Sequence, residues 1–146
     1  MTRYLLDTNA VGDLMNHRFG VERRAKEVRR EGAIVGTCEP VVAELYFGVE
    51  NSASHDENRL LLERTLPGLK CWPLTRVASQ EFGRLSAILK RQGRVIGPMD
   101  ILIASIAMTL PNCTVVSKTR IWQQYADSPL WTGRKDEMDH GSARRI

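Results

Sequence analysis

Three carboxylates, Asp7, Glu44 and Asp100, are the side chains of this sequence best suited to act together in chemistry. If the fold brings them within about 4 Å of one another, each pair repels by about 4 kcal/mol at an effective dielectric near 20. Three such pairs cost on the order of 10 kcal/mol, which is comparable with the stability of a whole domain. Such a cluster persists only by taking up protons or holding a cation, and all-oxygen ligands favour Mg²⁺ or Mn²⁺.

Asp7 lies at the boundary between two predicted elements. The apolar run at residues 3–6 is typical of a short buried strand, and helical spacing follows at Val11, Leu14 and Met15. In open α/β sheets, ligands bind beyond the carboxyl ends of the strands, which is where Asp7 is expected. An Asp at this position is also a good N-cap for the following helix, so the binding and capping roles both remain open.

Glu44 and Asp100 each belong to a predicted helix. Glu44 borders the apolar stripe of its helix, where a charge needs a partner, and an ion pair with an arginine is the alternative to a functional role. Asp100 occupies the first turn of a helix that is apolar nearly all round from Ile101 to Met108, which indicates a buried helix. The helix N-terminus favours a negative charge by about 0.3–1 kcal/mol, so capping is the alternative for Asp100.

Strands and helices alternate along the elements that must position these acids. Apolar runs predict strands over residues 3–6, 33–37, 69–74 and 113–117. Helical spacing predicts helices that follow Thr8 and that cover 21–30, 40–49, 56–66, 75–93 and 97–108, with a short helix through Trp122 and a weak strand near Leu130. This alternation predicts an α/β fold whose parallel sheet is covered on both faces.

Length and composition indicate one soluble domain. The 146 residues are 42% hydrophobic and 26% charged, which suits a single core. We expect the domain to span residues 1–132 and the polar tail at 133–146 to be disordered or ordered by a partner. No apolar run is long enough to cross a membrane and the N-terminus does not resemble a secretory signal, so a cytoplasmic location is expected. The net charge of +4 mildly favours a polyanionic partner.

Cysteine and histidine suggest no competing catalytic centre. Cys38, Cys71 and Cys113 are widely separated, lack metal-ligand spacing and are predicted to be reduced core thiols. The three histidines do not cluster in the sequence, which argues against a zinc site and a histidine-based triad. Any metal must therefore be held by oxygen.

The acids lie within three motifs that together resemble a known family. These are YLLDTN at residues 4–9, VAELYFG at 42–48 and RVIGPMDILIA at 94–104. Their ordered combination resembles the PIN-domain family and, within it, the VapC-type toxins of bacterial toxin–antitoxin pairs. The resemblance covers roughly residues 3–116.

The resemblance implies a three-layer α/β/α fold with a central, mostly parallel sheet. It also implies Mg²⁺- or Mn²⁺-dependent endoribonuclease activity, as the toxin component of a VapBC-type system. By position, Asp7, Glu44 and Asp100 match the family's catalytic metal-binding acids, and Thr8 and Asn9 match polar positions that support the first acid. The partners implied are RNA, a small antitoxin whose C-terminal segment blocks the acidic site, and a homodimer or a toxin–antitoxin hetero-oligomer.

The sequence departs from the family in the segment that follows the fourth predicted strand. Family members usually carry a further acid or Asn there, whereas residues 116–121 read VSKTRI. Ser117 can support a metal-bound water but supplies no charge, and Met99 stands where an Asn often precedes the third acid. Without the further acid, the sequence lacks a ligand that a second metal ion would use. These changes leave open a catalytically weak PIN module that binds RNA or an antitoxin without cutting.

The three acids suggest a mechanism. A cation held by Asp7 and Asp100 would polarise a phosphodiester, while Glu44 would bind or orient the attacking water or a second ion. Arg84, Arg91 and Arg94, in the helix and loop before the third acid, are candidates for contacts with the RNA backbone. A solvated helix face explains these arginines equally well.

A haloacid-dehalogenase-like phosphatase is a less favoured alternative. Its nucleophilic Asp follows a first strand in an Asp-x-Asp-x-Thr/Val pattern, which residues 5–11 approach, and Lys118 could imitate its later lysine. Asn9 stands where the second acid is required, however, and this assignment leaves Glu44 and Asp100 without a role.

Overall fold

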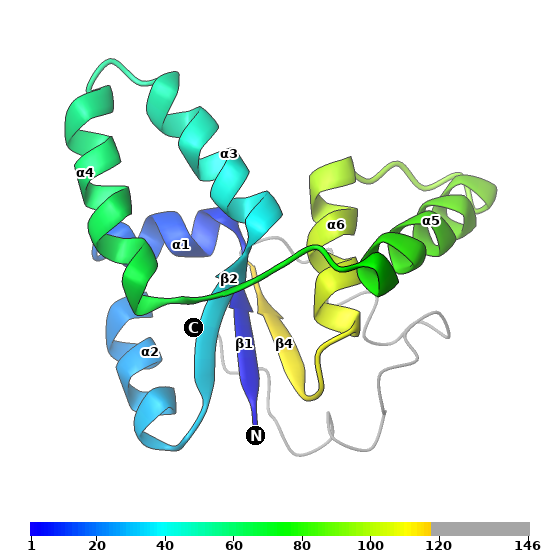
Figure 1. Cartoon of the computed structure of the whole chain (residues 1–146), viewed down its shortest axis with the longest axis horizontal. Coiled ribbons are helices and arrows are strands. Elements are labelled where there is room, and N and C mark those ends of the chain that lie inside the picture. The colour runs from blue at the N-terminus through cyan, green and yellow to red at the C-terminus, as the bar shows by residue number, and fades with distance from the viewer. Residues whose placement is uncertain (118–146) are drawn as a thin grey trace.

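A computed structural model describes residues 1–117 of the chain. It contains a parallel sheet of four strands, β1 (Arg3–Leu6), β2 (Ile34–Cys38), β3 (Lys70–Trp72) and β4 (Cys113–Val116), in the order β3-β2-β1-β4. Figure 1 shows β2, β1 and β4 side by side. The predicted helix through Trp122, the predicted strand near Leu130 and the tail at 133–146 lie outside the described residues. The predicted α/β fold with a parallel sheet is confirmed.

The strand order reverses at β1. The chain steps from β1 to β2 to β3 in one direction, and β4 then pairs with the other edge of β1. Such a reversal is the topological switch point at which open α/β sheets bind ligands, beyond the carboxyl ends of the strands. The residues that follow β1 and β4 therefore lie where a binding site is expected.

Helices connect the strands on both sides of this switch point. They are α1 (Thr8–Met15), α2 (Val21–Arg30), α3 (Glu39–Glu50), α4 (His55–Thr65), α5 (Arg76–Arg91) and α6 (Pro98–Met108), and the short 3₁₀ helix η1 (Leu66–Gly68) follows α4. In Figure 1, α1 to α4 lie on the β2 side of the view, and α5 and α6 lie on the β4 side. No helix within residues 1–117 combines the length and apolar character needed to cross a bilayer.

Two apolar clusters explain why α6 lacks a polar face. The main core packs Leu5 and Leu6 of β1 against surrounding helices and includes Ile103 and Ile106 of α6. A second cluster lies between α5 and α6 and includes Ile101 of α6. Because α6 is buried against the sheet on one side and against α5 on the other, its sequence is apolar nearly all round.

Gly36 allows β3 to approach β2 closely. A Cβ atom at this position would lie 2.3 Å from the carbonyl oxygen of Lys70 and 2.8 Å from the ring of Trp72, so a larger residue would separate the strands. On the other side of β2, the buried hydroxyl of Thr37 donates a hydrogen bond of 2.9 Å to the carbonyl oxygen of Leu6. This bond links the end of β2 to the end of β1.

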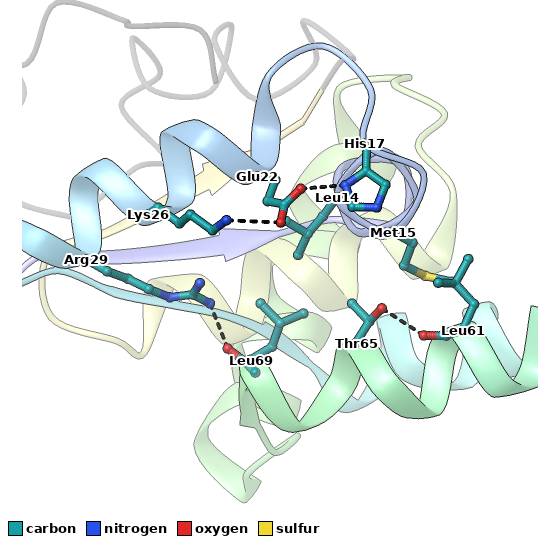
Figure 2. Close-up of a pocket in the computed structure, with 10 residues that line it drawn as sticks. Leu14, Met15, His17, Glu22, Lys26, Arg29, Leu61, Thr65 and Leu69 are labelled. Carbon is teal, nitrogen blue, oxygen red and sulfur yellow. Dashed lines mark hydrogen bonds and ion pairs between the residues drawn. The ribbon is translucent and has the colours of Figure 1, made fainter.

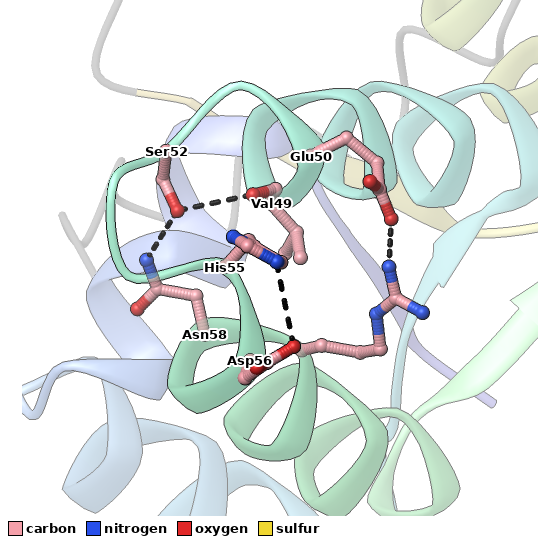
Figure 3. A network of polar contacts seen from close by, with 7 residues as sticks. Val49, Glu50, Ser52, His55, Asp56 and Asn58 are labelled. Atoms are coloured by element: carbon pink, nitrogen blue, oxygen red, sulfur yellow. Dashed lines mark hydrogen bonds and ion pairs between the residues drawn. The ribbon is translucent and has the colours of Figure 1, made fainter.

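Polar contacts close the turn between α3 and α4 (Figure 3). The Ser52 hydroxyl donates to the Val49 carbonyl oxygen at 3.0 Å, and the Asn58 amide donates to the Ser52 hydroxyl at 2.9 Å. An ion pair between Arg59 and Glu50 joins the two helices further along. These contacts hold α4 against α3, so that the two helices form a hairpin.

The cysteines are free, and their chemistry is suppressed by their surroundings. Cys38 is buried, whereas Cys71 and Cys113 are only partly buried, so the prediction of core thiols is confirmed fully for Cys38 alone. Burial raises the pKa of Cys38 to about 11 and is the main cause that raises the pKa of Cys71 and of Cys113 to about 12. All three thiols are therefore protonated near neutral pH, when they are poor nucleophiles and poor metal ligands.

Candidate active site

Asp7 is fixed at the end of β1 by backbone contacts. Its side chain is 6% exposed, and one carboxylate oxygen accepts a hydrogen bond of 2.8 Å from the backbone N–H of Ala10, which confirms the capping role in α1. Its own backbone N–H donates to the carbonyl oxygen of Val116 at 3.1 Å. Asp7 is thus held between the start of α1 and the end of β4.

The surroundings of Asp7 favour its protonated form. Burial is the main influence that raises the pKa of this carboxyl, and the negative charges of Asp100 and Asp13 raise it further. Hydrogen bonds from the Ser117 side chain and the Ala10 backbone lower the pKa but do not cancel the effect of burial. Asp7 is therefore a buried carboxylate that would gain from a bound cation.

Asp100 lies in the first turn of α6 and is partly buried. A Cβ atom added to Gly97 would lie 3.6 Å from an Asp100 carboxylate oxygen, so the carboxylate turns back toward the start of its own helix. It is close enough to Asp7 for its charge to raise the pKa of Asp7. The structure thus brings together two of the three predicted acids, although one lies 93 positions beyond the other in the chain.

Glu44 occupies the second turn of α3 and is also partly buried. The helix begins directly after β2 and packs against α1, which Asp7 caps, and against α6, which carries Asp100. Glu44 is not among the groups that shift the pKa of Asp7. No arginine or lysine within the described part of the chain forms an ion pair with Glu44, so the ion pair considered as its alternative role is not observed there.

The described residues contain no group of three or more His, Cys, Asp or Glu side chains that could together hold a metal ion. The expected gathering of carboxylates is therefore observed for Asp7 and Asp100 and not for the trio. This pair still fits Mg²⁺, because the ion is usually bound through one or two carboxylates, with water and substrate phosphates completing its shell. The donors near Asp7 are all oxygens, which suits Mg²⁺ or Mn²⁺.

Polar residues around Asp7 differ in their contacts. The hydroxyl oxygen of Thr8 is buried and has no hydrogen-bond partner among residues 1–117, so it could accept or donate a bond to a ligand. Asn9 is exposed. Ser117 forms a hydrogen bond with Asp7 through its side chain.

Asp13 is a further acid near the site that the sequence interpretation missed. It is 5% exposed and lies on α1, and its charge raises the pKa of Asp7. The available signal was its place between the apolar residues Val11 and Leu14, where a charged side chain on a buried stripe needs an explanation.

The candidate RNA-binding arginines fall into two groups. The guanidinium of Arg84 donates to the Glu81 carboxylate at 3.0 and 2.7 Å, so this arginine is engaged within its own helix. Arg91 ends α5, and Arg94 lies in the connection that leads to α6; both are exposed. Both lie closer in the chain to Asp100 than Arg84 does.

A groove between α1, α2 and α4 was not expected from the sequence (Figure 2). Its apolar lining comprises Leu14 and Met15 of α1, Leu61 of α4, and Leu69, which follows η1. Charged side chains surround this lining. Glu22 pairs with His17 at 2.5 Å and with Lys26 at 3.3 Å, and Arg29 donates to the carbonyl oxygen of Gly68 at 2.7 Å.

Comparison with known proteins identifies the family. The profile of the PIN domain matches residues 4–127, and the chain belongs to the PIN domain family. This match does not favour the phosphatase alternative.

Its relatives include VapC proteins. Ribonuclease VapC2 of Haemophilus influenzae is 32% identical over 111 residues, which cover 73% of this chain and 80% of the relative. The tRNA(fMet)-specific endonuclease VapC of Shigella flexneri is 26% identical over 125 residues, which cover 85% and 92% of the two chains. The fold is similar to that in the crystal structure of VapBC2 from Rickettsia felis bound to a DNA fragment from their promoter. That similarity has a TM-score of 0.78 and 25% identity and covers 91% of this chain and 98% of that chain.

Proposed function

We propose that this protein is a Mg²⁺- or Mn²⁺-dependent endoribonuclease and the toxin of a VapBC-type toxin–antitoxin pair, acting in the cytoplasm. The observation that carries the proposal is the buried carboxylate of Asp7, which lies at the switch point of the sheet and within reach of the charge of Asp100. The ribonuclease and endonuclease names of its VapC relatives support the reaction class.

In this proposal the protein's own groups orient the reactants. Asp7 and Asp100 would hold the ion, and the unpartnered hydroxyl of Thr8 would bind a water beside it. When bound, the divalent ion would supply the positive charge that polarises the phosphodiester and makes a bound water more acidic. Glu44, partly exposed on α3, would accept a hydrogen bond from the attacking water and align it with the phosphorus.

RNA would be held through its phosphates by the connection between α5 and α6. Arg91 and Arg94 are exposed there, and each phosphate contact that they make would release condensed counterions. Arg84 would contribute less than Arg91, because the Arg84 guanidinium is already paired with Glu81.

The groove between α1, α2 and α4 would take a segment of the antitoxin. Its apolar lining calls for apolar side chains on one face of that segment. Lys26 is paired with Glu22, so Arg29, which within residues 1–117 is bonded only to a backbone carbonyl oxygen, is the cation that favours an acidic side chain at the edge. The names of similar solved structures, which are VapBC complexes, support such a partner. Assembly as a homodimer or as a toxin–antitoxin hetero-oligomer is part of the same proposal.

Incubation of the purified protein with total RNA tests the proposal. We expect new RNA ends in Mg²⁺ or Mn²⁺, none in EDTA, and recovery when Mn²⁺ is added back. An Asp100→Asn variant, with Glu57→Gln on the exposed start of α4 as its control, should lose cleavage while the control retains it. Metal-independent cleavage would refute the mechanism. No cleavage, together with no Mn²⁺ binding in calorimetry, would support instead the weak module that binds RNA or antitoxin without cutting.

A further inference from the structure

Ser117 and Asp7 are neighbours by strand register. β1 and β4 are parallel and pair Leu6 with Val116, so the residues that follow the two strands, Asp7 and Ser117, lie side by side beyond the strand ends. The Asp7 backbone N–H donates to the Val116 carbonyl oxygen at 3.1 Å, which extends the pairing to this point. Paired residues of parallel strands direct their side chains to the same face, so the hydroxyl and the carboxylate meet.

The Asp7 carboxylate therefore has donors from two segments. The Ala10 backbone N–H binds one oxygen at 2.8 Å from the first turn of α1. The Ser117 side chain adds a hydrogen bond from the end of β4, and this bond lowers the pKa of Asp7 against the effect of burial. A carboxylate held by two donors at fixed places has a defined plane, with its remaining lone pairs left for other ligands.

A neutral donor at position 117 suits the charges around Asp7. Asp100 and Asp13 already act on Asp7 with like charge. A third carboxylate beside it would increase the repulsion, whereas a hydroxyl stabilises the negative charge without adding another. Thr8 provides a contrast, because its buried hydroxyl has no partner within the described residues and so orients nothing there.

We propose that Ser117 is a positioning residue whose hydroxyl orients the Asp7 carboxylate for metal binding, without itself binding the metal. The inference rests on the proposed function, in which Asp7 is a metal ligand. When a residue that orients a metal ligand through a hydrogen bond is removed, metal affinity or activity falls by about 10–100-fold. Ser117 should therefore affect the binding of the ion and the rate of the reaction but not the binding of RNA.

Three variants and three measurements test this role. The variants are Ser117→Ala, Ser117→Thr as the rescue, and Thr114→Val as a hydroxyl deletion at an exposed position of the same strand. We expect Ser117→Ala to weaken Mn²⁺ binding about tenfold in calorimetry and to lower kcat with little change in KM for RNA. In the metal-free protein, the Ala10 amide should exchange its hydrogen faster by NMR, because its acceptor is no longer held. Ser117→Thr should recover these properties and Thr114→Val should match the wild type.

The outcomes separate this inference from the proposed function. Wild-type Ala10 exchange and Mn²⁺ affinity in Ser117→Ala would overturn the positioning role. A wild-type protein that neither binds Mn²⁺ nor cuts RNA would refute the proposed function. In that case, unchanged Ala10 exchange in Ser117→Ala would still overturn the orienting bond, and faster exchange would support it.

Discussion

The polar residues of the candidate site come from two kinds of element, strand ends and helices, which differ in how firmly they fix a side chain. Asp7 and Ser117 follow neighbouring strands, where register and backbone hydrogen bonds fix their positions, and Asp7 is almost fully buried. Glu44 and Asp100 project from α3 and α6, and both are partly exposed. The difference indicates a division of roles. In the proposed site, a fixed strand end would hold the first metal ligand, and the acids on the helices would complete the site from packed but more accessible positions.

The largest expected effect is the loss of either member of the close pair. Asp7→Asn and Asp100→Asn should each lower RNA cleavage about 10³-fold, because each removes charge from the proposed metal site. Cleavage rates of a fluorescent RNA in Mn²⁺ measure the effect, with Glu57→Gln expected to match the wild type. Full activity in either variant would contradict the assignment.

A smaller loss of activity is expected when Glu44 is changed, because this acid lies on α3 and does not affect the pKa of Asp7. Glu44→Gln should lower kcat about 100-fold, as expected for a group that positions the water. Mn²⁺ affinity should stay within about threefold of the wild type. Removing a residue that orients a metal ligand usually costs more, about 10–100-fold. Glu39→Gln, at an exposed position of the same helix, is the control. If Glu44→Gln weakens Mn²⁺ binding as much as Asp7→Asn does, Glu44 is a direct ligand and the division of roles is wrong.

Metal-free stability should respond in the opposite sense to activity. The folded-state pKa of Asp7 is raised above its ordinary value of 3.8, so wild-type stability falls as pH rises between that value and the raised pKa. Asp7→Asn keeps a capping residue and removes the buried charge, and should raise the Tm at pH 7 by about 4 °C, equivalent to about 1 kcal/mol. The difference should fade as pH falls toward 3.8. Thermal melts in EDTA over a pH series measure it, and a lower Tm for the variant at pH 7 would contradict the account.

The smallest effect concerns RNA contacts outside the acidic site. Arg91→Ala should reduce the salt dependence of RNA binding by about 0.7 in the slope of log K against log salt, the value of one phosphate contact on a single strand. Arg84→Ala should change the slope little, because its guanidinium is paired with Glu81. Binding titrations with a catalytically inactive Asp7→Asn background measure both slopes. Equal losses would show that the ion pair does not restrain Arg84.

Local sequence features predicted the elements well, and they correctly placed Asp7 at the end of the first strand. The apolar run before Asp7 gave β1, and the apolar character of residues 101–108 correctly indicated that α6 is buried. The bond between Ser117 and Asp7 and the influence of Asp13 were not predicted. They depend on the register of β4 against β1 and on the rotation of α1, which no local pattern determines.

The groove between α1, α2 and α4 escaped prediction for a similar reason. Its lining residues come from separate helices and from η1 and β3 boundaries, and each looked like an ordinary core or surface position in the sequence. The distance between Glu44 and the other acids likewise depends on how α3 leaves the sheet. The carboxylates proposed to bind the metal, by contrast, carry their own signal, because a carboxylate beside an apolar segment is costly without a partner.

The proposed metal site between Asp7 and Asp100 is tested most directly by a crystal structure of the protein grown with Mn²⁺, with anomalous data collected at the manganese edge. We expect one strong peak in contact with carboxylate oxygens of both Asp7 and Asp100, and its absence from Asp7→Asn crystals grown in the same way. A peak bound elsewhere, or wild-type carboxylates with no peak between them at saturating Mn²⁺, would contradict the account.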